Sequence, residues 1–201
     1  MVVPLPACDP GPFRLLVRVL HGEVVPLHNS FVVELLAVAK QFGAVELAAE
    51  CSAYIAKSRD PAHVCHMLCM ARLYDEPAVM QRCLALVDER PESVAAGVLE
   101  LPSELLALLV SRGSFLLPGG EAAIYELILR WAEGMQRTIR GQGLSLQQLA
   151  APVLEHVRFG LLSGAELQEV RQLFAGYATI ARRVDKVLTA QFEQRAAASD
   201  S

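Results

Sequence analysis

Apolar residues recur at helical spacing along most of the chain, and over residues 35–87 their pattern is repeated. The segment LLAVAKQFGAVELAAECSAYI (Leu35–Ile55) aligns without a gap with MLCMARLYDEPAVMQRCLALV (Met67–Val87), at an offset of 32 positions. Any two hairpins rich in Ala and Leu look somewhat alike, but small residues at matching positions, such as Ala39 and Ala71, favour structural equivalence. Since one helical hairpin cannot bury both of its faces, the repeat predicts two hairpins stacked on a shared core.

Breaks in the pattern divide the chain into an almost continuous series of helices. The helices of the repeat are predicted at Phe31–Phe42, Val45–Lys57, Ala62–Tyr74 and Pro77–Glu89. Further helices are predicted at Pro12–Gly22, Glu92–Leu99, Pro102–Ser111, Glu121–Arg137, Leu167–Phe174 and Ile180–Phe192. Another begins at Ser145, and Pro152 is expected to kink or shorten it. Met1–Leu5 (MVVPL) could form one short strand, and Ala196–Ser201 is expected to fray. The predicted fold class is all-α, built of stacked helical hairpins.

Polar residues just ahead of apolar runs predict where several helices begin. Ser145 with Gln148, and Ser163 with Glu166, have the spacing of capping boxes. Asp60 precedes a proline and is a candidate N-cap for the second hairpin.

Composition narrows the class of protein further. Hydrophobic residues make up 53% and charged residues 20% of the 201 residues, and charges interrupt every long apolar run, so no transmembrane helix is expected. The opening residues lack the pattern of a signal peptide, and five cysteines fit reduced thiols better than a disulfide framework. We therefore expect an intracellular protein, cytoplasmic or nuclear. A net charge of −4 with dispersed Lys and Arg argues against nucleic acid as a partner, and the high apolar content favours a face that binds protein.

The most suggestive group of chemically active side chains is His63, Cys65, His66 and Cys69, all on one predicted helix. A zinc ion needs ligands that converge from two segments, because one helix offers at most two, and only Cys83 could supplement this set. The simpler interpretation is that the cysteines pack as small apolar residues. We expect no bound metal or cofactor, although a metal protein using these residues stays a hypothesis that elemental analysis would test.

Signals for catalysis are weak elsewhere. Gly119-Gly120 precedes a helix but lacks the lysine and spacing of a phosphate-binding loop, and no G-x-S-x-G sequence is present. Glu121, Glu126 and Glu133 are predicted to lie on solvated helical faces. We therefore expect no enzyme activity.

Recognition of another protein remains, and the two stacked hairpins offer a surface for it. An apolar groove between hairpins accepts an amphipathic or extended peptide. The candidate lining residues are Val64, Leu68, Leu73, Tyr74 and Leu84. For each of them taken singly, a place in the core is the commoner outcome.

Five segments, in this order, resemble a BTB (POZ) domain followed by a BACK domain. VVPLPACDPGPFRLLVRVLHGEV (Val2–Val24) resembles a strand and helix in the second half of a BTB domain, and Phe31–Ile55 resembles its closing helical pair. Pro61–Glu89 resembles the first hairpin of a BACK domain, Leu99–Glu133 its middle section, and LAAPVLEHVRFGLLSGAEL (Leu149–Leu167) its closing segment. The resemblance divides the chain into a C-terminal part of a BTB domain (1–58), a BACK domain (59–175) and a C-terminal helix with a disordered tail (176–201).

The resemblance implies a scaffolding function. Proteins of this family commonly homodimerise through the BTB domain and bind cullin-3 as substrate adaptors of a ubiquitin ligase. Carried onto this chain, the cullin groove would involve the hairpins at Phe31–Lys57 and Ala62–Glu89. The front half of the BTB fold, with its dimer interface and cullin-contact motif, would lie ahead of Met1, which leaves BTB-type homodimerisation in doubt. A helical-repeat scaffold with no ubiquitin-ligase role is the alternative.

Overall fold

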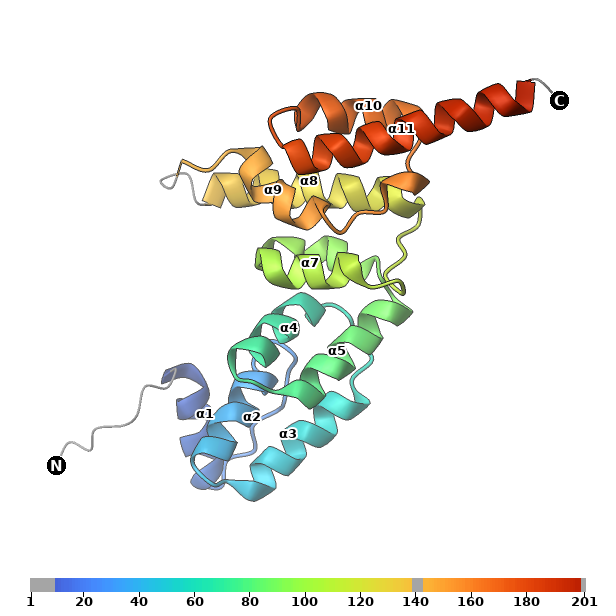
Figure 1. The fold of residues 1–201 in the computed structure, drawn as a ribbon. Helices are drawn as coiled ribbons and strands as arrows, with labels where there is room; N and C mark the ends of the chain where they lie inside the picture. The colour runs from blue at the N-terminus through green and yellow to red at the C-terminus, as the bar shows by residue number, and fades with distance from the viewer. Residues whose placement is uncertain (1–9, 139–142, 200–201) are drawn as a thin grey trace. The chain divides into compact units, whose positions relative to one another are not determined.

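The computed structural model describes residues 10–138 and 143–199, with side chains up to residue 194, and comprises two compact units, Met1–Glu100 and Leu101–Ser201. The described residues form helices and short 3-10 turns and contain no strand, which confirms the all-α prediction (Figure 1). The strand considered at Met1–Leu5 lies outside the described residues. Within the described residues no helix is both long enough and apolar enough to span a bilayer.

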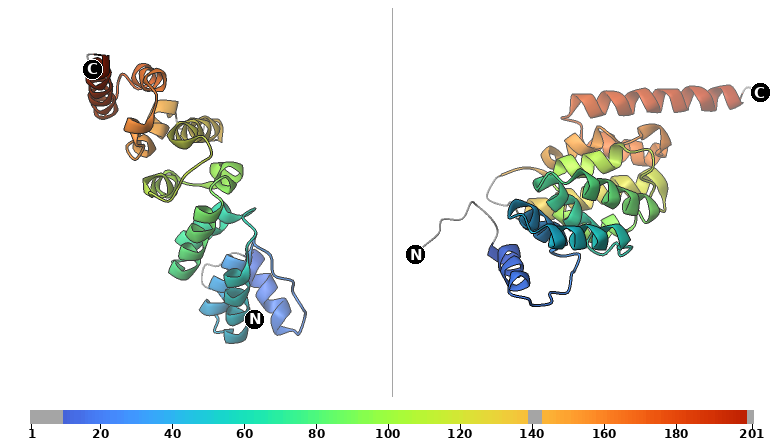
Figure 2. Two further views of the ribbon diagram at one scale, coloured as in Figure 1. Left: turned by 90° about the vertical axis from the view of Figure 1, so that its right-hand side faces the viewer. Right: turned by 90° about the horizontal axis from the view of Figure 1, so that it is seen from below.

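The first unit is built from antiparallel helical pairs joined by short turns (Figures 1 and 2). Helices α2 and α3 form one hairpin, and α4 and α5 form the next; α1 packs on α2, and α6 with η1 packs on α4. The elements are α1 (Pro10–Leu20), α2 (Val32–Gln41), α3 (Val45–Lys57), α4 (Val64–Leu73), α5 (Pro77–Glu89), α6 (Ser93–Gly97) and the 3-10 turn η1 (Val98–Glu100).

The two hairpins have the same bounds at an offset of 32, as the repeat predicts. Their turns are also equivalent: Gly43 and Asp75 both have positive φ, at 71° and 54°. In each turn the next residue donates its backbone N–H to the carbonyl of the small helical residue five positions back, from Ala44 to Ala39 and from Glu76 to Ala71, both at 2.8 Å. This bond closes a helix whose chain leaves through a left-handed residue. The repeat is therefore a repeat of backbone geometry.

Burial repeats with the backbone. Cys51 and Cys83 are each 0% exposed, and α2 packs against α4 while α3 packs against α5. Other matching pairs are equally buried: Leu36 with Leu68, Ala39 with Ala71, Leu47 with Val79 and Ile55 with Val87. The two hairpins thus share one core, because each covers the face that the other would leave open.

One sequence-based helix start was misplaced. α4 begins at Val64, and Asp60 accepts the backbone N–H of Ala62 at 2.9 Å in the turn before it. Asp60 therefore closes an Asx turn ahead of the helix and does not cap it, because Asp readily bonds the backbone two residues on. By contrast, Pro77 begins α5 as predicted.

Gly97 lets α6 approach α4 closely, which gives a testable prediction about packing. A Cβ added at Gly97 would lie 2.9 Å from the Cβ and 3.2 Å from the Sγ of buried Cys65. Gly97→Ala is therefore expected to lower the free energy of unfolding by about 1–3 kcal/mol through overpacking. Gly113→Ala is the matched control, since nothing lies within 4 Å of its added Cβ. Equal urea midpoints for the two variants would contradict the close approach.

In the described part of the second unit, α9 packs against both α7 and α8, and α10 packs against α11. The elements are α7 (Ser103–Ser111), α8 (Gly120–Thr138), α9 (Leu146–Leu154), α10 (Gly164–Leu173) and α11 (Ala178–Ser199), with the 3-10 turn η3 (Phe159–Leu161) before α10. Both capping boxes form as predicted, from Ser145 with Gln148 and from Ser163 with Glu166. α11 reaches Ser199, so the described part of the expected tail is helical.

Trp131 lies at the centre of the second unit. Its side chain is 1% exposed, and its indole N–H donates to the carbonyl of Leu101 at 2.9 Å. Ile128 and Ile124, one and two turns earlier on α8, are both 0% exposed, so one side of this helix is buried. The indole therefore joins α8 to the segment that leads into α7.

Glu121 contradicts the prediction of a solvated face. It is 4% exposed and accepts the backbone N–H of Arg158 at 2.6 Å and that residue's side-chain Nε–H at 3.0 Å. A further ion-pair distance, from Nη2 to Oε2, is 2.8 Å. Helical periodicity around α8 could not show this, because the partner comes from a segment 37 residues later.

Candidate protein-docking surfaces

The five residues predicted to line a groove between the hairpins do not lie together on one surface. Val64 and Leu68 are 1% and 0% exposed and belong to the shared core, so they cannot line an open groove. Leu84 and Tyr74 are half-buried, and Leu73 alone is well exposed, at 68%. The apolar side of α4 that would have lined the groove is instead buried between the stacked hairpins. Leu73, near the C-terminal end of α4, remains a candidate contact for another protein.

The side chains considered for zinc binding contact different groups and do not converge on one point. Cys65 lies against the carbonyl of Val94 at 3.8 Å, and Cys69 against the carbonyl of Glu100 at 3.1 Å. His63 packs edge-on against His28, with ring centroids 5.1 Å apart. Among the described residues no group of three or more His, Cys, Asp and Glu side chains is arranged to hold a metal ion.

His66 instead joins the two hairpins. Its Nε2 lies 3.0 Å from Oε1 of Glu34, the equivalent position in the first hairpin, and its Nδ1 lies 3.6 Å from Glu100. Glu34 is 8% exposed, so its carboxylate depends on this contact. A second link joins Lys40 to Glu76 at 2.7 Å. These polar contacts set the register of the stack. The sequence offered one indication of them, the offset of 32 between residues 34 and 66.

Burial makes the described thiols poor nucleophiles. Loss of solvation raises the pKa of Cys51 and of Cys69 to about 11, with the charge of Glu50 and of Glu100 adding to the effect. The same loss of solvation raises the pKa of Cys65 and of Cys83 to about 12. Since the thiolate is the reactive form, these side chains are packing residues.

The raised thiol pKa values predict a loss of stability in alkali. The thiols ionise near pH 9 when the chain is unfolded and near pH 11–12 when it is folded. Their contribution to the free energy of unfolding is therefore complete below pH 9 and falls as the pH rises towards 12. Urea unfolding at pH 8–11 is expected to show this decline, and Cys83→Ala should make it shallower. An equal decline in Cys83→Ala and the parent chain would contradict a role for this thiol.

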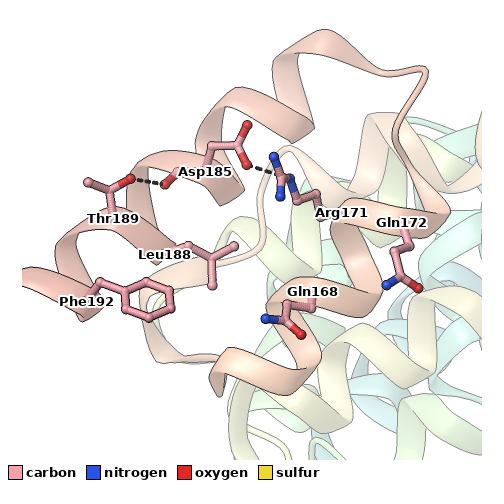
Figure 3. A pocket seen from close by; sticks show the side chains of 7 residues that line it. All are labelled: Gln168, Arg171, Gln172, Asp185, Leu188, Thr189 and Phe192. Carbon is pink, nitrogen blue, oxygen red and sulfur yellow. Dashed lines mark hydrogen bonds and ion pairs between the residues drawn. The ribbon is translucent and has the colours of Figure 1, made fainter. Parts of the chain in front are cut away.

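An open groove follows the α10–α11 hairpin on the second unit (Figure 3). Its larger part has a volume of about 440 Å³, and Leu188 and Phe192 of α11 form its apolar wall. An ion pair between Arg171 and Asp185, at 2.7 Å, closes one end. The remaining lining residues are polar or small: Ser163, Gly164, Ala165, Gln168, Gln172, Thr189 and Gln191. Phe192 is 66% exposed, so the groove presents apolar surface to solvent.

α11 is held firmly against the rest of the unit. The guanidinium of Arg183 donates to the carbonyls of Glu155 and Val157, at 2.5 and 2.9 Å, and lies 4.7 Å from the centre of the Phe159 ring. Next to this anchor Val184 is 0% exposed, and Ile180, one turn earlier, is 2% exposed. The spacing of apolar residues predicts the helix but not this anchor, since an arginine on an amphipathic helix usually faces water.

Comparison with known proteins adds family information to this geometry. Residues 64–172, more than half of the chain, match the family described as "BACK: BTB And C-terminal Kelch". BTB/POZ domain-containing protein 6 of Homo sapiens is 27% identical over 202 residues, which cover 92% of this chain and 37% of that protein. Its Mus musculus counterpart is 25% identical over 189 residues, which cover 86% of this chain and 35% of that protein. BTB/POZ domain-containing protein 3 of Homo sapiens is 24% identical over 131 residues, which cover 64% of this chain and 25% of that protein. The chain thus spans little more than a third of the length of the first two relatives.

Proposed function

Because the chain belongs to the BTB/POZ–BACK family, we propose that it is a protein-interaction adaptor that links a partner protein to a cullin-3 ubiquitin ligase. It binds and positions other proteins and performs no chemistry itself. In this role the protein works in the cytoplasm or nucleus. Residues 59–175 are the proposed BACK region, and residues 1–58 the proposed C-terminal part of the BTB domain.

The stacked hairpins α2–α3 and α4–α5 are the observation that supports this proposal most directly. They form a rigid platform with equivalent turns and one shared core, and the family match begins with the first residue of α4. A platform of this kind keeps its exposed residues at fixed separations, so a partner can bind without ordering it first. Leu73 is the exposed apolar residue that this platform presents from α4.

A direct test is capture of this chain by the immobilised N-terminal domain of cullin-3. Because the relatives are nearly three times as long, the test includes the chain extended at its N-terminus to the length of a complete BTB domain. Leu73→Glu is expected to weaken capture, since it places a charge at the proposed contact. Leu161→Glu is the matched control, because Leu161 is also 68% exposed but lies in the second unit.

The outcomes separate two functions. Capture that Leu73→Glu weakens and Leu161→Glu leaves unchanged supports the cullin adaptor. No capture of either chain length removes the ligase role and leaves the alternative, a helical-repeat scaffold without a ubiquitin link. The uniform 32-residue spacing of the hairpins favours that alternative in such a case, because stacked repeats are a general protein-binding architecture.

A further inference from the structure

Helix α11 is more than twice as long as the helix that it packs against. It has 22 residues, about 33 Å, whereas α10 has 10 residues, about 15 Å. Figure 1 shows α11 continuing well past the end of α10. Helices in proteins are stabilised mainly by tertiary packing, so the side of α11 that faces away from α10 is open to packing against a partner.

The outer face of α11 carries two opposite charges in a regular arrangement. Lys186 and Glu193 are both exposed and lie seven residues apart, which puts them on the same side of the helix. Among the described residues neither side chain forms an ion pair. Phe192, 66% exposed, lies beside Glu193 and borders the groove of Figure 3. The outer face thus carries one positive and one negative charge, and Phe192 lies at its border with the groove.

We propose that two copies of this chain associate through antiparallel α11 helices. In an antiparallel pair with its two-fold axis beside Thr189 and Ala190, Lys186 of each copy lies level with Glu193 of the other. Two ion pairs form by symmetry, as an isologous interface requires. A parallel pair would bring Lys186 against Lys186 and Glu193 against Glu193, so electrostatics selects the antiparallel arrangement.

The same arrangement covers the exposed aromatic ring. Phe192 lies one residue from Glu193, so in the antiparallel pair it reaches the methylene stem of Lys186 in the second copy. That stem is apolar, and the ammonium group at its end remains free to reach the carboxylate. The charge pattern identifies a second copy as the occupant, because both members of each ion pair come from this helix.

Charge exchange between copies provides a sharp test, using the full 201-residue chain and sedimentation velocity over a range of concentrations. Lys186→Glu and Glu193→Lys are each expected to weaken self-association about tenfold, because each turns two attractive pairs into repulsive ones. The double variant Lys186→Glu/Glu193→Lys should restore it. An equimolar mixture of the two single variants should form heterodimers, since every pair in the mixed dimer is again attractive.

Lys57→Glu is the control, because Lys57 is an exposed lysine of α3 in the first unit. Unchanged circular dichroism and melting curves will show that the variants fold, as expected for exposed positions. Three results would overturn the proposal: a parent chain that stays monomeric at every concentration, single variants that associate like Lys57→Glu, or a mixture that forms no heterodimer. Association through another face, such as a BTB-type interface, would leave all three α11 variants unaffected and so counts against it.

Discussion

Replacing Trp131 with alanine is expected to lower the free energy of unfolding by about 3–5 kcal/mol, the usual cost of removing a buried Trp. The ring is 1% exposed at the centre of the second unit, so its loss leaves a large cavity between α8 and its neighbours. The carbonyl of Leu101 also loses the indole N–H that it accepts at 2.9 Å. A loss of this size is a large share of the stability of an ordinary domain. Urea unfolding followed by circular dichroism measures it.

Trp131→Phe separates the two contributions. It keeps an aromatic ring in the cavity but removes the N–H, so it should cost less than the alanine variant, about 1–3 kcal/mol with repacking included. Leu108→Ala serves as the control, because Leu108 is 40% exposed on α7 and its truncation creates no enclosed cavity. Trp131→Ala with the urea midpoint of Leu108→Ala would show that the indole is not a central packing element.

Glu121→Ala is the second substitution with a large expected effect, a loss of about 3 kcal/mol. Glu121 accepts both the backbone N–H and the guanidinium of Arg158, and its carboxylate is almost fully enclosed. Removing it leaves the backbone N–H of Arg158 and its guanidinium, on a side chain that is only 37% exposed, without their acceptor, which costs more than the intact pair contributes. The backbone around Arg158 should also loosen, which faster amide hydrogen exchange at residues 157–159 would reveal.

A double-mutant cycle with Arg158→Ala tests whether the effect arises from this pair. The two substitutions together should cost clearly less than the sum of the single costs, because each removes the same interaction. Glu126→Ala is the matched control, since Glu126 lies on the same helix but is exposed. Additive costs in the cycle would contradict the coupling, whatever the size of the single effects.

Much of the first unit could be predicted because the sequence features that determine it lie close together in the chain and occur twice. The spacing of apolar residues, the breaks near Gly43 and Asp75, and the matching small residues predicted hairpins whose bounds the structure reproduces within a few residues. Capping boxes at Ser145 and Ser163 were equally predictable, because both partners of each box lie within four residues.

The docking surfaces were less predictable, since an apolar residue in a helical pattern is equally suited to a core and to a groove. Val64 and Leu68 proved to be core residues, whereas Leu73, five positions after Leu68, is exposed. The groove bordered by Phe192 was not predicted at all, because α10 and α11 had first to be placed side by side.

The sequence by itself determined the helices, their order, the doubled hairpin and the family, since periodicity, turn residues and motif order are properties of neighbouring positions. Only the tertiary structure decided which side chains lose their water. It buried Glu121 beside Arg158, paired Glu34 with His66, and used Arg183 to anchor α11. These contacts join residues 26–37 positions apart in the chain. A pattern of neighbouring residues cannot predict which of such distant residues come into contact.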